Sequence, residues 1–215
     1  QGHIRREERF ENRLDFRQDR CIFQVQLPRI SGLGSLQDCL FFCARRKGDG
    51  PMKPRCMVYI DGFNLYYGAV RGTRHKWLDL EAYFRRLRPH DDIQTIYYFT
   101  ARVSGARGLR QMQYLKALAT LPTVQVILGK FKFKDVQCRV RSCRHPGKRV
   151  FEMPEEKRTD VNIALRLLDD AHYDRADRFI VVSGDSDLVP AVEMVKAQAP
   201  DKEIIVYVPS SHEIR

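Results

Sequence analysis

The sequence lacks long hydrophobic runs, and none of its 215 residues lies in an apolar stretch that approaches the roughly 20 residues of a membrane span. The first residues are charged and are followed by no apolar segment typical of a secretion signal. We therefore expect a cytoplasmic protein without a membrane partner. Its six cysteines are scattered along the chain, and in that compartment free thiols or metal ligands are favoured over disulfides.

Acidic residues are also few relative to basic ones, since 27 Asp and Glu face 38 Lys and Arg for a net charge of +11. An excess of this size favours a polyanionic partner, although it says nothing about the fold. More than half of the excess lies between Lys130 and Arg158, which contains ten basic residues and four acidic ones.

The first part of the chain gives a weak structural signal. Residues 1–51 show no sustained helical or strand period, although Ile22–Leu27 has the pattern of a strand and Leu36–Ala44 that of a short helix. We expect this part to be a poorly ordered or non-native extension, with the natural start at Met52 or Met57. A regulatory arm is the alternative.

From Cys56 onward, β-branched and aromatic runs alternate with segments of helical spacing. The expected strands are Cys56–Ile60, Ile93–Thr100, Val124–Leu128, Phe179–Val182 and Glu203–Val208. The expected helices are Leu65–Val70, one that follows an Asp79 cap, one over Leu109–Ala119, Asp160–Ala171 and Leu188–Gln198. This alternation predicts an α/β fold over residues 52–215, a three-layer α/β/α sandwich with a mainly parallel sheet of about five strands. No helix follows the last strand, so we expect the domain to lack its final helix.

A basic, cysteine-containing insertion is expected at about residues 135–153. Its Cys138, Cys143 and His145 are soft ligands, but zinc needs a fourth ligand and usually a closer cysteine spacing. A zinc site is therefore possible, and a flexible basic loop with incidental cysteines is favoured. The preceding Lys130–Lys134 alternates lysine with phenylalanine, which predicts an edge strand whose lysines discourage aggregation, contact phosphate, or both.

Four aspartates are predicted at one edge of the sheet. Asp61 follows the first strand, Asp185 and Asp187 follow the fourth, and Asp160 opens the helix that leads into the fourth strand. The carboxyl ends of parallel strands share one edge, where open α/β sheets place their sites. Like charges this close are unfavourable unless a cation or proton offsets them.

Such a cluster fits Mg²⁺ or Mn²⁺, which take oxygen ligands, and beside a basic surface it suits phosphodiester hydrolysis. Each residue also has a local interpretation. Asp61 would cap the helix at Asn64, Asp187 would cap the helix after it, and Asp160, behind a Thr159 cap, would favour the helix dipole. It is less favoured that all four aspartates have only such capping or helix-dipole roles, because they are all predicted at one edge of the sheet.

Three motifs in order then resemble a known family. They are Ile-Asp-Gly-Phe-Asn (60–64), Glu-Glu-Lys-Arg-Thr-Asp-Val (155–161) and Ser-Gly-Asp-Ser-Asp-Leu (183–188). Together they resemble NYN domains, in particular the LabA-like branch of the PIN-like nuclease superfamily. The resemblance implies a Rossmann-like sandwich with a Mg²⁺- or Mn²⁺-dependent ribonuclease site formed by Asp61, Asp160, Asp185 and Asp187.

The same resemblance implies that Asn64 orients Asp61 and that Ser183 touches phosphate or a water at the metal. Basic residues expected to contact the substrate are Arg102, Lys130, Lys132 and Arg158. Arg158 departs from the family pattern, in which glycine often follows the lysine. Tyr66 and Tyr67 either stack bases or pack within a helix, and packing is favoured.

The sequence thus predicts a metal-dependent ribonuclease with RNA as its partner. DNA is not excluded as a substrate, and the protein could form homo-oligomers. The alternative is a catalytically silent nucleic-acid-binding or regulatory module with the same fold.

Overall fold

A mixed sheet of six strands forms the centre of the protein, whose structure, a computed structural model, describes residues 23–26 and 52–210. The strand order is β1-β8-β7-β2-β3-β4. The strands are β1 (Phe23–Gln26), β2 (Arg55–Asp61), β3 (Asp92–Thr100), β4 (Val124–Leu128), β7 (Arg178–Val182) and β8 (Glu203–Pro209). All neighbours from β8 to β4 are parallel and β1 is antiparallel to β8, which confirms the mainly parallel five-stranded sheet.

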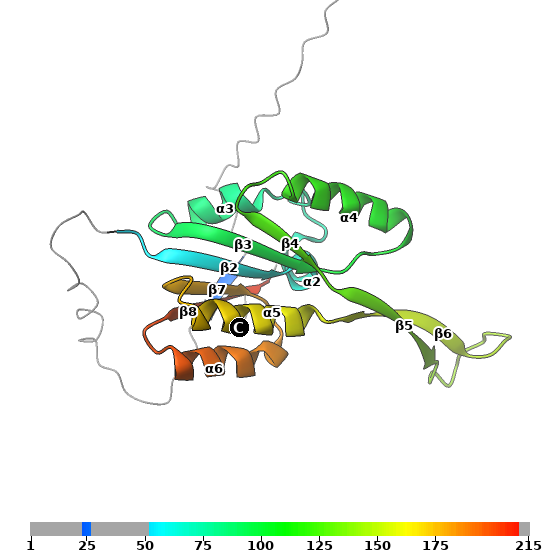
Figure 1. Cartoon of the computed structure of the whole chain (residues 1–215). Coiled ribbons are helices and arrows are strands. Elements are labelled where there is room, and N and C mark those ends of the chain that lie inside the picture. The colour runs from blue at the N-terminus through cyan, green and yellow to red at the C-terminus, as the bar shows by residue number, and fades with distance from the viewer. Residues whose placement is uncertain (1–22, 27–51, 211–215) are drawn as a thin grey trace, which may run out of the picture.

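Helices cover both faces of this sheet. They are α2 (Gly62–Leu65), the π-helical turn η1 (Tyr66–Val70), α3 (Leu80–Leu87), α4 (Gly105–Leu118), α5 (Thr159–His172), the 3₁₀ turn η2 (Ser186–Leu188) and α6 (Val189–Gln198). Figure 1 shows α3 and α4 over one face and α5 and α6 over the other, which is the predicted three-layer sandwich. Among the described residues, no helix is long and apolar enough to cross a membrane.

The central strand β2 explains why both faces need helices. Val58 and Ile60 belong to an apolar core that includes Phe84 of α3, whereas Met57 and Tyr59 belong to a core on the opposite face. Successive side chains of a strand point to opposite faces, so a strand apolar throughout is buried on both. Burying each large side chain stabilises the fold by roughly 1.5–3 kcal/mol. The two cores together fix β2, and with it the position of Asp61.

The predicted strand in the first part of the chain is present as β1. Phe23 lies opposite Pro209 and Gln26 opposite Val206, so β1 covers the edge of β8. The rest of residues 1–51, including the expected helix Leu36–Ala44, lies outside the described residues. The expected start of the domain remains a prediction.

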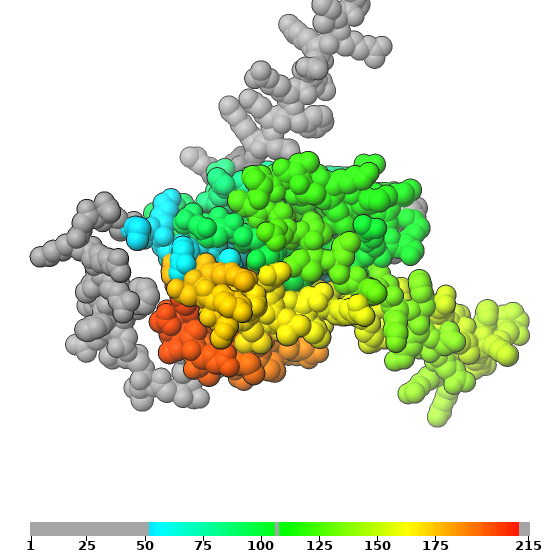
Figure 2. Space-filling view, viewed as in Figure 1, coloured from blue at the N-terminus to red at the C-terminus, as the bar shows by residue number. Residues whose placement is uncertain are grey.

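A β-hairpin forms where the sequence predicted a flexible loop after Lys134. Its strands β5 (Lys130–Gln137) and β6 (Val150–Lys157) are antiparallel and form a separate two-stranded sheet. The hairpin projects from the body of the domain in Figures 1 and 2. The cysteine-containing residues 138–149 form the loop at its tip, as predicted, whereas β6 and the end of β5 beyond Lys134 were missed. The strand β6 gave a weak signal because it contains Pro154 and adjacent glutamates, which are poor strand formers by themselves.

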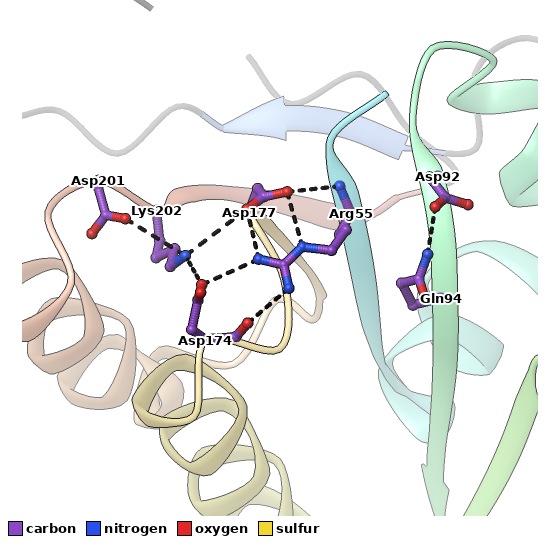
Figure 3. Close-up of polar contacts among 7 residues, drawn as sticks. All are labelled: Arg55, Asp92, Gln94, Asp174, Asp177, Asp201 and Lys202. Carbon is purple, nitrogen blue, oxygen red and sulfur yellow. Dashed lines mark hydrogen bonds and ion pairs between the residues drawn. The ribbon is translucent and has the colours of Figure 1, made fainter. Parts of the chain in front are cut away.

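A polar cluster joins the amino ends of β2 and β7 (Figure 3). The backbone N–H and the Nη2 of Arg55 donate to Asp177 at 3.0 and 2.9 Å, and Arg55 Nη2 also donates to Asp174 at 3.2 Å. Lys202 also pairs with Asp174. The hydrogen bond from Arg55 holds the pKa of Asp177 below its usual range. These acids lie at the opposite sheet edge from Asp61, and each has a basic partner.

Candidate active site

Asp61 is the best anchored of the four predicted carboxylates. It ends β2, is 3% exposed, and caps α2 by accepting the N–H groups of Phe63 and Asn64 on Oδ1, both at 3.0 Å. Its Oδ2 accepts the Asn64 side-chain amide at 2.6 Å and the Ser183 hydroxyl at 3.3 Å. The capping interpretation of Asp61 is therefore confirmed, and it leaves the carboxylate at the carboxyl edge of the sheet.

Gly62 allows the turn after Asp61 to pack tightly. A Cβ at this position would lie 2.7 Å from Tyr98 Cζ and 2.8 Å from the Phe99 carbonyl oxygen, both in β3. Any larger residue would push α2 away from the sheet. Burial, followed by the charge of Asp61, raises the pKa of the Tyr98 hydroxyl, so this phenol stays neutral beneath the site.

Asn64 and Ser183 join the ends of β2 and β7. Asn64 Oδ1 accepts the Gly184 N–H at 3.1 Å, while its amide donates to Asp61. Ser183 Oγ donates to Asp61 and accepts the Asp185 N–H at 3.1 Å. Both side chains thus lie at the site as predicted, and their hydrogen bonds position its loops.

Asp185 and Asp187 follow β7 in the order that the sequence indicated, but their local roles differ from the prediction. Asp185 Oδ1 accepts the Asp187 N–H at 3.0 Å and caps the short turn η2. The alternative interpretation, that Asp187 caps the following helix, is wrong, because the capping position of α6 belongs to Leu188. Asp185 is half-buried and Asp187 is exposed.

Asp160 connects α5 to this group of carboxylates. It lies in the first turn of the helix and is half-buried. Burial, followed by the charges of Asp185, Asp61 and Asp187, raises its pKa. All four predicted aspartates therefore lie at one edge of the sheet and interact electrostatically.

Glu156 is a fifth acidic residue at this edge, and the sequence reasoning did not select it. It lies in β6, is half-buried, and accepts the Thr159 hydroxyl. Burial raises its pKa to about 7, with smaller contributions from Asp61 and Asp160 and an opposing one from the Thr159 hydrogen bond. Glu156 lies four residues before Asp160 in the second motif, and this spacing was the signal that could have identified it. No strand was predicted at this position, so there was no reason to expect its side chain at the sheet edge.

The entry into α5 also differs from the expected Thr159 cap. Thr159 is the first helical residue, and the capping position belongs to Arg158, which has a left-handed backbone with φ of 80°. Glycine adopts this conformation at no steric cost, which explains physically why glycine is frequent there. Gly129 lies across from this turn, where a Cβ would come within 2.8 Å of Thr159 Oγ1.

The predicted substrate-contacting residues are spread more widely than the carboxylates. Arg102 is exposed just after β3, at the same edge. The hairpin pairs Lys132 with Glu155 and Phe131 with Glu156. Opposed residues share a face and successive ones alternate, so Lys130 and Lys132 lie on the face away from Glu156.

The donor set suits a hard divalent ion, since carboxylate oxygens are the ligands that Mg²⁺ and Mn²⁺ prefer. The mutual charge effect on Asp160 is what such an ion would relieve. As the side chains stand, no three His, Cys, Asp or Glu residues in the described part of the chain are close enough to hold a metal. This includes Cys138, Cys143 and His145, whose cysteines are free and half-buried.

A sequence profile of the NYN domain matches residues 55–214, which include every residue of this site. The chain belongs to the NYN domain family. This NYN protein is thereby related to the PIN-like nuclease superfamily, as the three motifs indicated.

Individual relatives add detail. The chain is 31% identical over 202 residues to a Pseudomonas putida protein named 6-hydroxy-3-succinoylpyridine 3-monooxygenase HspA, covering 80% of this chain and 64% of that protein. The NYN chain thus spans just under two thirds of that relative's length. A crystal structure of a Vibrio parahaemolyticus protein of unknown function is similar with a TM-score of 0.47 and 20% identity, over 73% of this chain and 82% of that one.

Proposed function

We propose that this NYN protein is a cytoplasmic ribonuclease of the LabA-like branch that depends on Mg²⁺ or Mn²⁺. The observation that supports the proposal best is the position of the four aspartates, since Asp61 ends β2, Asp160 lies in the first turn of α5, and Asp185 and Asp187 follow β7 at the same sheet edge. Burial, followed by the charges of Asp185, Asp61 and Asp187, raises the pKa of Asp160, which agrees with this grouping. Carboxylates from three separate elements gathered at one sheet edge are typical of a metal-dependent phosphodiesterase.

Asp61, Asp160, Asp185 and Asp187 would hold the divalent ion, which when bound supplies charge neutralisation and water activation for phosphodiester hydrolysis. Asn64 and Ser183 keep Asp61 and the loop after β7 in register through their hydrogen bonds. These hydrogen bonds fix the carboxylates before substrate arrives, so little reorganisation is needed at the reaction step.

Basic residues around this edge would hold the RNA backbone. Arg102 and Arg158 are exposed beside the carboxylates, and the hairpin tip, Cys138–Arg149, contains five basic residues and no acidic one. Lys130 and Lys132 are exposed nearer the base of the hairpin. Phosphate contacts of this kind position a strand without reading its sequence.

RNA cleavage tests this proposal. Single-stranded and structured RNAs are incubated with Mg²⁺, Mn²⁺ or EDTA, and the rate of the intact protein is compared with those of Asp160→Asn and Asp185→Asn. Each variant should lose about a hundredfold or more in rate, because a ligand to the ion is neutralised. Asp201→Asn is the matched control, since Asp201 is an exposed aspartate far from the carboxyl edge, paired with Lys202 at 3.5 Å.

One outcome would reject the nuclease, and another would reject the proposed site. If no RNA is cleaved with either ion and Asp185→Asn binds RNA at least as well as the intact protein, the silent binding module is the better description. If cleavage occurs but persists in Asp160→Asn and Asp185→Asn, the active site lies elsewhere.

The Pseudomonas relative raises a second candidate, monooxygenation of a hydroxypyridine, because that protein is named as 6-hydroxy-3-succinoylpyridine 3-monooxygenase. Mass spectrometry after incubation of the protein with 6-hydroxy-3-succinoylpyridine, oxygen and a reductant tests this candidate. A product with an oxygen atom from O₂ at ring position 3, formed with release of the succinoyl chain, would favour it over the nuclease. RNA cleavage without such a product would favour the nuclease.

A further inference from the structure

Four aromatic side chains form a continuous row next to the candidate active site. Phe131 of the hairpin packs edge-on against Phe63 with ring centroids 5.7 Å apart. Phe63 lies nearly parallel to Tyr67 at 6.2 Å, and Tyr66 meets Tyr67 edge-on at 5.2 Å. The row therefore runs from the base of the basic hairpin across α2 to η1.

The outer end of this row is open to solvent. Both tyrosines pack within the helical segment, as favoured, but Tyr66 is 40% exposed and Tyr67 is 58% exposed, so part of each ring faces solvent. The exposed Arg71 places its guanidinium carbon 5.5 Å from the centre of the Tyr67 ring. Two phenol rings and a cation thus share one surface.

The π-helical turn explains this exposure. The Arg71 N–H donates to the Tyr66 carbonyl at 2.7 Å, which closes a wider turn than an α-helix would. Leu65, Ala69 and Val70 fill the core, while the two consecutive tyrosines remain outside. Turns of this type are frequent at functional sites.

The row is directly coupled to the carboxylates. Phe63 belongs to the helix that Asp61 caps, and its N–H donates to that carboxylate. Asn64, one residue further, connects Asp61 to the loop after β7. A ligand lying on Tyr66 and Tyr67 therefore extends from the edge that contains Asp61, Asp160 and Asp185.

We propose that Tyr66, Tyr67 and Arg71 form a stacking platform for the bases of a single-stranded nucleic acid that enters the candidate active site. This inference rests on the proposed function, because that function identifies the bound single strand as RNA. Exposed aromatic rings and arginine planes stack unpaired bases with little sequence preference. The net charge of +11 and the adjoining basic hairpin favour a polyanion over a second, equally charged copy of this chain.

Binding measured in EDTA tests the platform independently of catalysis. A fluorescently labelled oligouridine, a DNA oligothymidine and an abasic oligomer of the same length are titrated with the intact protein, Tyr67→Ala and Tyr67→Phe. Tyr67→Ala should bind the oligouridine about tenfold more weakly and leave abasic binding unchanged, because it removes the ring but no charge. Tyr67→Phe should bind as the intact protein does, and an equal loss on DNA would show that the platform reads bases and not sugars.

Tyr173→Ala is the matched control. Tyr173 is 63% exposed and lies under the Arg175 guanidinium at 5.1 Å, but it follows α5 at the opposite sheet edge. This variant should bind all three oligomers normally.

The proposal is overturned if Tyr67→Ala binds the oligouridine normally, if the intact protein binds no oligomer, or if the loss is equal for the abasic oligomer. It is also overturned if sedimentation shows that Tyr67→Ala dissociates a dimer, since the rings would then join two copies of the chain. If Tyr67→Ala cleaves RNA with an unchanged KM, the stacking platform is rejected and the ribonuclease is kept. If binding depends on the bases but no RNA is cleaved, the ribonuclease is rejected and the stacking platform is kept.

Discussion

Asp61 shows that a local role and a functional role can belong to one residue. Its Oδ1 caps α2, and its Oδ2 holds Asn64 and Ser183. The capping explanation and the active-site explanation are therefore compatible. The capping bonds fix the carboxylate at the sheet edge.

Glu156 gives a prediction about pH. Its pKa of about 7 in the folded protein exceeds the value of about 4.3 for an unperturbed glutamate. Between these values the folded state binds more protons than the unfolded state, so the free energy of unfolding should fall as pH rises. In EDTA, Glu156→Gln should melt a few degrees higher than the intact protein at pH 8 and at nearly the same temperature below the unperturbed pKa, at about pH 4.

Glu155→Gln is the control for this measurement. The hydrogen bond from Lys157 lowers the pKa of the neighbouring Glu155, so neutralising it should not raise the melting temperature at pH 8. If the melting temperatures of the intact protein and Glu156→Gln depend on pH in the same way, the pKa of Glu156 is not raised in the folded protein.

At the level of elements, the hairpin is the feature that carries much of the basic charge excess. The nine basic residues from Lys130 to Lys157 are all exposed, and within the described residues only Lys157 among them forms an ion pair. Among the described strands, β5 and β6 pair only with each other, so the hairpin presents these charges apart from the central sheet.

Neutralising the hairpin tip should therefore weaken RNA binding without unfolding the domain. The triple variant Arg139→Ser, Arg141→Ser, Arg144→Ser should flatten the dependence of log K on log salt by about 0.7 for each phosphate that the tip no longer neutralises. Its melting temperature should be unchanged. Binding titrations at several salt concentrations provide the measurement.

Lys116→Ser serves as the comparison, because Lys116 is an exposed lysine in the last turn of α4, away from the carboxyl edge. It should leave the salt dependence intact. A triple variant with the slope of the intact protein would mean that the tip does not contact the strand.

The strands of the central sheet could be predicted because burial on both faces requires apolar runs such as Phe179–Val182. The hairpin strand β6 could not, because its sequence favours a strand only when β5 lies beside it. Helix starts were predicted to within a few residues. The exact capping residues depended on backbone angles, such as that of Arg158, that no pattern reveals.

At the level of the whole molecule, acidic residues separate into two groups with different surroundings. At the amino edge of the sheet, Asp174 and Asp177 are paired with Arg55 and Lys202. At the carboxyl edge, burial and then the charges of Asp185, Asp61 and Asp187 raise the pKa of Asp160. The sequence predicted this second grouping from topology, because parallel strands end together. The sequence could not predict the distances between these side chains. Within the described residues, no three His, Cys, Asp or Glu side chains are close enough to hold a metal ion.

A crystal of the protein soaked in Mn²⁺ and measured at a wavelength with manganese anomalous signal tests the central claim most directly. We expect an anomalous peak at the carboxyl edge, bounded by Asp61, Asp160, Asp185 and Asp187, that is absent from crystals of Asp185→Asn. A protein that shows no peak there at millimolar Mn²⁺, or a peak that survives Asp185→Asn, would contradict the account.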